Sequence, residues 1–145
     1  MVHALPLSCN AREKVNKYAE LKDKVKNFAV LLVEDDRAVT KELKIFLSKF
    51  FSSVGTAENG AQGVEKFKQN KYRIVFADVI MPVMDGWEMV DRINKISPDT
   101  FIVMLSASKS FGDASKHKYD AFLKKPVGFK DMISIIKEII RKFSL

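Results

Sequence analysis

Short, almost wholly apolar runs alternate with amphipathic stretches along most of this chain, and this alternation limits the fold more than any other feature. Runs at 28–33, 72–77 and 101–105 consist mainly of β-branched, aliphatic and aromatic residues, as parallel strands buried on both faces do. Shorter strand signals lie at 53–57 and 121–123, and helical periodicity lies at 40–51, 61–69, 87–96 and 129–143. Strands separated by helices need crossover connections. The pattern predicts an α/β fold, a three-layer doubly wound sandwich around a five-stranded parallel sheet.

Length and composition are those of one domain with an N-terminal appendage. The chain has 145 residues, of which 47% are hydrophobic, and that proportion excludes intrinsic disorder. Its apolar runs are much shorter than the roughly 18 residues that a membrane helix needs. The single cysteine, Cys9, cannot form an internal disulfide, which is typical of a reducing compartment. We therefore expect a cytoplasmic protein without membrane association.

The positive charge of the chain is concentrated at its two ends. The formal net charge is +7, with +3 in residues 1–29, +4 in residues 124–145 and a balance of charges between them. A nucleic-acid-binding domain gathers basic residues on one face, whereas these residues lie on ordinary amphipathic segments and are better explained as solvated helix faces. We therefore expect no nucleic-acid partner for this chain.

Residues 1–28 stand outside the alternating pattern and are predicted to form a unit ahead of a domain at 29–145. A poorly ordered tail is expected first. Arg12–Asn27 then has the spacing of an amphipathic helix, with apolar residues at three- and four-residue steps: Val15, Tyr18, Leu21, Val25 and Phe28. Such a helix can dock on the domain, pair with a second copy or belong to a linker, and the sequence leaves these alternatives open.

Acidic, hydroxyl and basic side chains directly follow the predicted strands. In chain order they are Glu34, Asp35, Asp36, Asp78, Ser106 and Lys125. The carboxyl ends of parallel strands meet at one edge of the sheet, so the four acidic side chains should lie close together. Their carboxylates would then repel one another unless a cation such as Mg²⁺ lay between them. An aspartate beside a metal ion, an amine and a hydroxyl can act as a nucleophile toward a phosphoryl group. Taken singly, the acidic run can also be a helix cap, Asp85-Gly86 a plain turn and Lys125 a surface residue.

The motifs around these positions resemble the receiver domain of two-component response regulators over residues 29–145. The matching strings are VEDD at 33–36, FADVIMPVMDGWE at 76–88, MLSAS at 104–108 and FLKKP at 122–126. The resemblance implies a flavodoxin-like sheet with strand order 2-1-3-4-5, to which this chain adds an N-terminal helical extension.

The resemblance also implies a role for each site residue. Asp78 is similar to the phosphoacceptor, and Asp36 is then an additional helix-cap residue. A Mg²⁺ or Mn²⁺ ion would be held directly by Asp35, Asp78 and the backbone carbonyl of Ile80, and through water by Glu34. Lys125 would pair with the phosphoryl group, and Ser106 and Phe122 would form the switch. Pro126 would follow a cis peptide bond.

The function that the resemblance implies is a phosphoryl-accepting switch rather than a conventional enzyme, although the domain can remove its own phosphate. A sensor histidine kinase or a histidine phosphotransfer protein would phosphorylate Asp78. The change would reach an unidentified protein target through the family's fourth helix, fifth strand and fifth helix. A homodimer would use that surface or the N-terminal helix.

Other functions fit the sequence less well. The main alternative is a receiver-like interaction domain that works without phosphorylation. A phosphatase of the haloacid dehalogenase type is disfavoured because Ile80 occupies the place of its second aspartate. A dinucleotide-binding module would need a glycine-rich turn after the first strand, where this chain has acidic residues.

Two features depart from the family pattern. Ser106 and Lys125 lie 19 positions apart, roughly one helical turn less than usual, so the helix within 108–119 is predicted to be short, frayed or displaced. Ile80 and Ser108 stand two positions after the phosphoacceptor and the switch hydroxyl. Because Ile80 would exclude a hydrolytic water that a polar side chain would orient, we expect a long-lived aspartyl phosphate.

Overall fold

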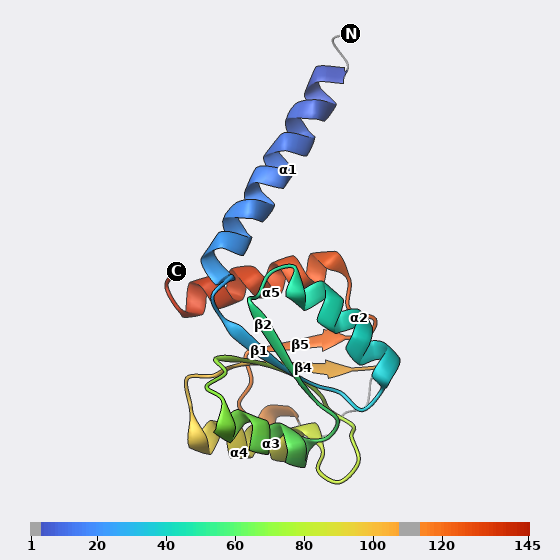
Figure 1. Cartoon of the computed structure of the whole chain (residues 1–145), viewed down its shortest axis with the longest axis vertical. Coiled ribbons are helices and arrows are strands. Elements are labelled where there is room, and N and C mark those ends of the chain that lie inside the picture. Colours follow the sequence, from blue (N-terminus) through green and yellow to red (C-terminus); the bar gives the residue numbers. More distant parts are fainter. Residues whose placement is uncertain (1–3, 108–113) are drawn as a thin grey trace.

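The computed structural model describes residues 4–107 and 114–145. Its elements are α1 (Ala4–Val25), β1 (Ala29–Val33), α2 (Arg37–Ser48), β2 (Ser53–Ala57), α3 (Gly60–Gln69), β3 (Ile74–Asp78), α4 (Gly86–Ile96), β4 (Phe101–Ser106), the 3₁₀ helix η1 (Ala114–Lys116), β5 (Ala121–Lys124) and α5 (Phe129–Lys142). In this part of the chain one parallel sheet has the order β2-β1-β3-β4-β5 (Figure 1), as predicted. The order reverses between β1 and β3, which is where open α/β sheets place their sites. None of the described helices is long and apolar enough to cross a membrane.

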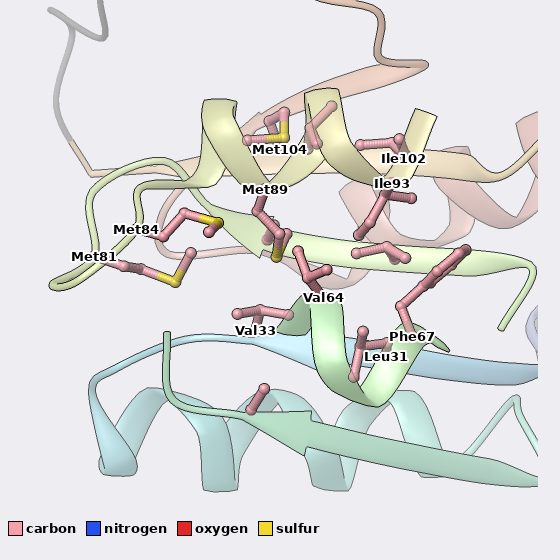
Figure 2. Close-up of a cluster of buried hydrophobic side chains, with 14 of the residues drawn as sticks. Leu31, Val33, Val64, Phe67, Met81, Met84, Met89, Ile93, Ile102 and Met104 are labelled. Carbon is pink, nitrogen blue, oxygen red and sulfur yellow. The ribbon is translucent and has the colours of Figure 1, made fainter. Parts of the chain in front are cut away.

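Two apolar clusters hold the helices against the sheet. Successive side chains of a strand point to opposite faces, so each buried strand contributes to both clusters. The cluster beneath α3 and α4 joins Leu31 and Val33 of β1 to Phe67 of α3 and Met89 of α4 (Figure 2). The opposite cluster holds α2 and α5 through residues such as Leu47, Phe76 and Ile136. Burial on both faces explains the continuous apolar runs of β1, β3 and β4.

Polar residues that follow the strands fix the starts of three helices. The side chains of Asp36, Asn59 and Asp85 accept hydrogen bonds from backbone N–H groups in the first turns of α2, α3 and α4. Such N-caps satisfy donors that have no acceptor within the helix. Because Asp36 caps it, α2 begins at Arg37, three residues before the predicted start. Asp36 is therefore the helix cap that the sequence predicts.

The N-terminal helix is longer than predicted. α1 begins at Ala4, so the expectation of a poorly ordered tail is wrong from that residue onward. Pro6 is compatible with this start because it lies in the first turn, where backbone N–H groups need no acceptor within the helix. Most of α1 projects away from the domain (Figure 1), but its last turns dock: Tyr18 stacks on Phe129 of α5 with ring centroids 5.8 Å apart, and Val25 is fully buried. The division into 1–28 and 29–145 stays a prediction.

The connection between β4 and β5 is tied to α4. Residues 108–113, with Ser108 among them, lie outside the described residues, and the described part of the connection contains only the three-residue helix η1. His117 follows η1, and its ring stacks on Trp87 with centroids 4.6 Å apart. Nδ1 of His117 lies 2.8 Å from Oδ1 of Asp91. These contacts hold residues 114–119 against α4.

Candidate functional site

Three residues from different strands meet beyond the carboxyl end of the sheet. Glu34 follows β1, Asp78 ends β3 and Lys125 follows β5. Each stands two positions after a strand residue of the cluster beneath α2 and α5, namely Leu32, Phe76 and Leu123. Because side chains two apart in a strand point to the same face, the three polar side chains are directed to one side. The Lys125 N–H donates to the Ser106 carbonyl at 2.9 Å, so β5 remains in register with β4 up to the site.

Lys125 bridges the two buried carboxylates. Its Nζ lies 2.5 Å from Oε1 of Glu34 and 3.0 Å from Oδ2 of Asp78. The Glu34 side chain is fully buried, and those of Asp78 and Lys125 are 11% and 15% exposed. Charged groups this deeply buried need partners. The alternative that Lys125 is an ordinary surface lysine therefore does not describe the structure.

Asp35 completes an acidic cluster with Glu34 and Asp78. One carboxylate oxygen from each residue lies within 4.8 Å of the other two, and Asp35 is the exposed member. Oε2 of Glu34 is buried and has no hydrogen-bond partner among the described residues. Ionised carboxylates only accept hydrogen bonds, so a proton or a second cation would satisfy the Glu34 oxygen that Lys125 does not contact. The donor set consists of hard oxygen atoms and fits a divalent cation such as Mg²⁺.

The environment of this cluster shifts two pKa values. Burial raises the pKa of Glu34, and the neighbouring Asp78 raises it further; Lys125 offsets part of the effect, and the pKa is about 7 instead of 4.5. Burial lowers the pKa of the Lys125 ammonium, but the hydrogen bonds and charges of Glu34 and Asp78 outweigh burial, so this pKa is raised above 10.5. The amine therefore stays charged at neutral pH, while Glu34 exchanges a proton near pH 7.

The residues predicted to form the switch lie on β4, which is paired with the strand of Asp78, and on β5, the next strand beyond β4. Ser106 is the last residue of β4, between the strands that carry Asp78 and Lys125, and it is 2% exposed. Phe122 of β5 is half-buried, and its ring centroid lies 6.2 Å from that of Trp87 in α4. The hydroxyl and the aromatic ring are therefore on neighbouring strands, and the ring reaches the aromatic contacts around α4.

The remaining predicted residues border the cluster along the chain. The peptide bond between Lys125 and Pro126 is cis. Ile80 lies in the loop after β3, and its side chain is 63% exposed. The structure thus brings four predicted residues, Glu34, Asp35, Asp78 and Lys125, into one cluster.

Two features of the site are not predicted by the sequence. Gly86 is more than part of a turn, because a Cβ atom there would overlap the backbone carbonyl oxygen of Asp78. The spacing Asp85-Gly86 after a strand-end aspartate is the only sequence signal for this close approach. The stacking of Trp87 on His117 joins segments far apart in the chain, and no local pattern indicates it.

Comparison with known proteins gives the same family. A profile of the response regulator receiver domain matches residues 30–137. The uncharacterized transcriptional regulatory protein YesN of Bacillus subtilis (strain 168) is 31% identical over 119 residues, which cover 78% of this chain and 32% of YesN. The response regulator receiver protein CpdR of Brucella abortus (strain 2308) is 30% identical over 114 residues, which cover 77% of this chain and 95% of CpdR. This chain spans between 23% and 59% of the length of several other curated relatives.

A solved structure with similar architecture is the response regulator protein TrrA of Thermotoga maritima in complex with Mg²⁺-BeF. It has a TM-score of 0.71 and 28% sequence identity, and the match covers 77% of this chain and 98% of TrrA. The profile spans most of the chain, and the sheet order agrees with it. Receiver domains are phosphoacceptor signalling switches of two-component systems rather than conventional enzymes. This chain belongs to the response regulator receiver domain family.

Proposed function

We propose that this domain accepts a phosphoryl group on Asp78 and that the modification switches a protein-interaction surface. The observation that carries the proposal is the position of the Asp78 carboxylate, which is nearly buried at a strand end and lies 3.0 Å from Nζ of Lys125. This geometry holds an anion next to a permanent positive charge, at the edge where α/β sheets place reactive groups. An aspartate so placed can attack phosphorus and form an acyl phosphate.

The transfer exchanges one bond for another. An oxygen of Asp78 attacks the phosphorus of a phosphohistidine, the new O–P bond forms, and the N–P bond to the imidazole breaks with its electron pair on the nitrogen. Lys125 already contacts the Asp78 carboxylate, and its ammonium would pair with the phosphoryl oxygens. The Ser106 hydroxyl, on the strand between them, would donate a hydrogen bond to one of those oxygens.

The acidic cluster would hold a divalent cation, Mg²⁺ or Mn²⁺. Asp35, Asp78 and the backbone carbonyl of Ile80 would be direct ligands, and Glu34 would bind through water. The buried Oε2 of Glu34 without a partner and the three carboxylate oxygens within 4.8 Å support this assignment. When bound, the ion neutralises negative charge on the transferring phosphoryl group. The related TrrA was solved in complex with Mg²⁺-BeF.

The proposed donor is a sensor histidine kinase or a histidine phosphotransfer protein, and the proposed target is an unidentified protein. Inward movement of Ser106 would let Phe122 follow and would change the surface made by residues 114–119, β5 and α5. The contacts of Phe122 with Trp87 and Tyr119, at centroid distances of 6.2 and 6.1 Å, support this route. Of the two predicted homodimer surfaces the proposal keeps this one, and the proposed location is cytoplasmic.

Treatment with acetyl phosphate and Mg²⁺, followed by intact mass measurement, tests the chemistry. We expect one added phosphoryl group on the wild type and none on Asp78→Asn or in the presence of a chelator. Asp36→Asn is the matched control, because asparagine keeps the helix cap, and it should be labelled like the wild type. Absence of labelling on the wild type would favour the phosphorylation-independent interaction domain. Labelling of Asp78→Asn would move the acceptor to another residue.

Fluorescence of Trp87, the one tryptophan of the chain, tests the proposed switch. Because its ring packs against Phe122, phosphorylation should change its emission in the wild type. Ser106→Ala should be labelled on Asp78 but should show a much smaller emission change. An equal change in both proteins would contradict a route through the Ser106 hydroxyl.

A further inference from the structure

A groove with an apolar floor runs between α5 and α1, the helix that is additional to the strand-and-helix alternation. It has a volume of about 380 Å³, within the range of about 300–1,000 Å³ that is usual for binding pockets. Its apolar lining comes from Val15, Tyr18 and Leu21 of α1 and from Phe129 and Ile133 of α5. Val15 and Phe129 are 66% and 51% exposed. Large apolar side chains exposed next to one another are unusual and mark interaction sites.

Lysines supply all the charge that lines this groove. They are Lys14 and Lys17 of α1 and Lys137 of α5, and the described lining residues include no carboxylate. None of the three has an ion-pair partner among the described residues, whereas Arg92 and Arg141 on the helices α4 and α5 pair with glutamates of their own helices. An apolar floor with an unneutralised basic rim is complementary to an apolar surface with acidic flanks.

We propose that the groove between α1 and α5 binds an amphipathic helix of a partner protein, with an apolar stripe flanked by acidic residues. The lining runs from position 14 to 21 on α1 and from 129 to 137 on α5, roughly 11–12 Å at 1.5 Å per residue. This length matches about two turns of a helix, whose apolar residues at i, i+3 or i+4, and i+7 would face the floor. Glutamates or aspartates beside that stripe would then meet the lysines of the rim.

Charge makes a second copy of this chain a poorer occupant. α1 has five basic and three acidic residues, and α5 has four and two. Either helix of a second copy would therefore bring further positive charge to a basic rim, which is unfavourable. A membrane surface is also a poorer fit, because the apolar residues form the floor of a concavity rather than a projecting stripe. The favoured occupant is thus an acidic helix.

Two synthetic helical peptides probe the groove by NMR with the full chain labelled with ¹⁵N. Both peptides carry leucines at i, i+4 and i+7; one has glutamates on the flanking positions and the other has lysines. At peptide concentrations up to about 1 mM, where weak recognition is still visible, the acidic peptide should shift amide signals of residues 14–21 and 129–137. The lysine peptide should bind at least about tenfold more weakly. Equal binding of the two peptides, or no shifts with either, would overturn the proposal.

Substitutions at the rim and the floor separate this recognition from general charge effects. Val15→Glu should abolish binding of the acidic peptide. Combined reversal of the rim lysines, Lys14→Glu, Lys17→Glu and Lys137→Glu, should reverse the preference toward the lysine peptide. The matched control reverses three exposed lysines elsewhere, Lys71→Glu, Lys95→Glu and Lys116→Glu, and should keep the original preference. A reversal of preference in the control as well would overturn the assignment to this groove.

Two further measurements test the other occupants with the same variants. Sedimentation should show no self-association that depends on Val15, and wild-type chain should not bind vesicles of phosphatidylglycerol and phosphatidylcholine through the rim lysines. Dimerisation that Val15→Glu abolishes would assign the groove to a second copy. Vesicle binding that the rim reversal abolishes would assign it to a lipid surface. Either result would overturn the proposal, and neither bears on phosphorylation of Asp78.

Discussion

Replacing Lys125 by methionine should change how the stability of the protein without Mg²⁺ depends on pH. Between about pH 7 and 9 the free energy of unfolding of the variant should fall, whereas that of the wild type should stay nearly constant. Methionine keeps most of the volume of the lysine stem and removes the charge. In the wild type, Nζ of Lys125 contacts both Glu34 and Asp78, and the lysine side chain is only 15% exposed. Its removal leaves two buried carboxylates without a compensating charge, a change that costs about 3–5 kcal/mol in buried pairs.

The direction of the pH dependence follows from the raised pKa of Glu34. Because this pKa is about 7 in the folded chain and 4.5 ordinarily, the protonated carboxyl favours the folded state. Its contribution is complete below pH 4.5 and is lost as the pH rises through 7, about 3 kcal/mol in all. About one pH unit above this pKa the wild type should lose no more stability through this group. In Lys125→Met the pKa rises further, so the loss continues at up to about 1.4 kcal/mol per pH unit.

Urea unfolding in EDTA at several pH values from 5 to 9 measures this difference. Between pH 7 and 9 the variant should lose up to about 3 kcal/mol more than the wild type. Lys124→Met, at the exposed neighbouring residue, should follow the wild-type curve. When Mg²⁺ is used in place of EDTA, the difference in unfolding free energy between wild type and Lys125→Met should become smaller, because the charge of the ion replaces that of the ammonium. Parallel curves for wild type and Lys125→Met from pH 7 to 9 would refute the electrostatic reasoning.

Three further predictions concern the loop after β3 and the first residue of α4. Gly86→Ala should lower the free energy of unfolding by about 1–3 kcal/mol, because its Cβ would overlap the Asp78 carbonyl oxygen. Gly128→Ala is the control in the same urea titration. It should be nearly neutral, because its Cβ would meet only Oδ2 of Asp131, at 3.7 Å. Val83→Asn should raise stability by about 1 kcal/mol, because Val83 has φ 68° and asparagine tolerates this left-handed conformation better; an unchanged thermal midpoint would contradict the strain. Ile80→Asn should accelerate loss of phosphate from Asp78 in Mg²⁺, with Val83→Asn as the control loop variant, and equal decay rates would remove the water-exclusion hypothesis.

The central strands of the sheet could be predicted because a strand that is buried on both faces consists of apolar residues without interruption. The runs Val30–Val33, Ile74–Ala77 and Phe101–Leu105 are buried throughout, so each reads as an uninterrupted apolar segment. Helix boundaries were less predictable, because they depend on capping rather than on periodicity. The start of α2 is set by the cap residue Asp36, whereas periodicity alone places it three residues later.

The composition of the site could be predicted because parallel strands collect their end residues at one edge, whatever the helices between them do. The protonation of the site could not, since the pKa of Glu34 depends on its burial and on distances to residues elsewhere in the chain. The position of α1 also depends on tertiary contacts. Its periodicity is compatible with docking, pairing or a linker, and the stacking of Tyr18 on Phe129 shows that its last turns dock on α5.

Charge balance connects the state of the metal-free pocket to phosphoryl transfer. When ionised, Glu34, Asp35 and Asp78 carry three negative charges against the one positive charge of Lys125, a net charge of −2. A proton on Glu34 removes one of these charges near pH 7, and a divalent cation removes both. The proposed phosphorylation of Asp78 would replace a single carboxylate charge by a group with nearly two, so it would make a bound cation more favourable. Linkage then requires reciprocity: phosphorylation should tighten Mg²⁺ binding by the factor by which Mg²⁺ favours phosphorylation.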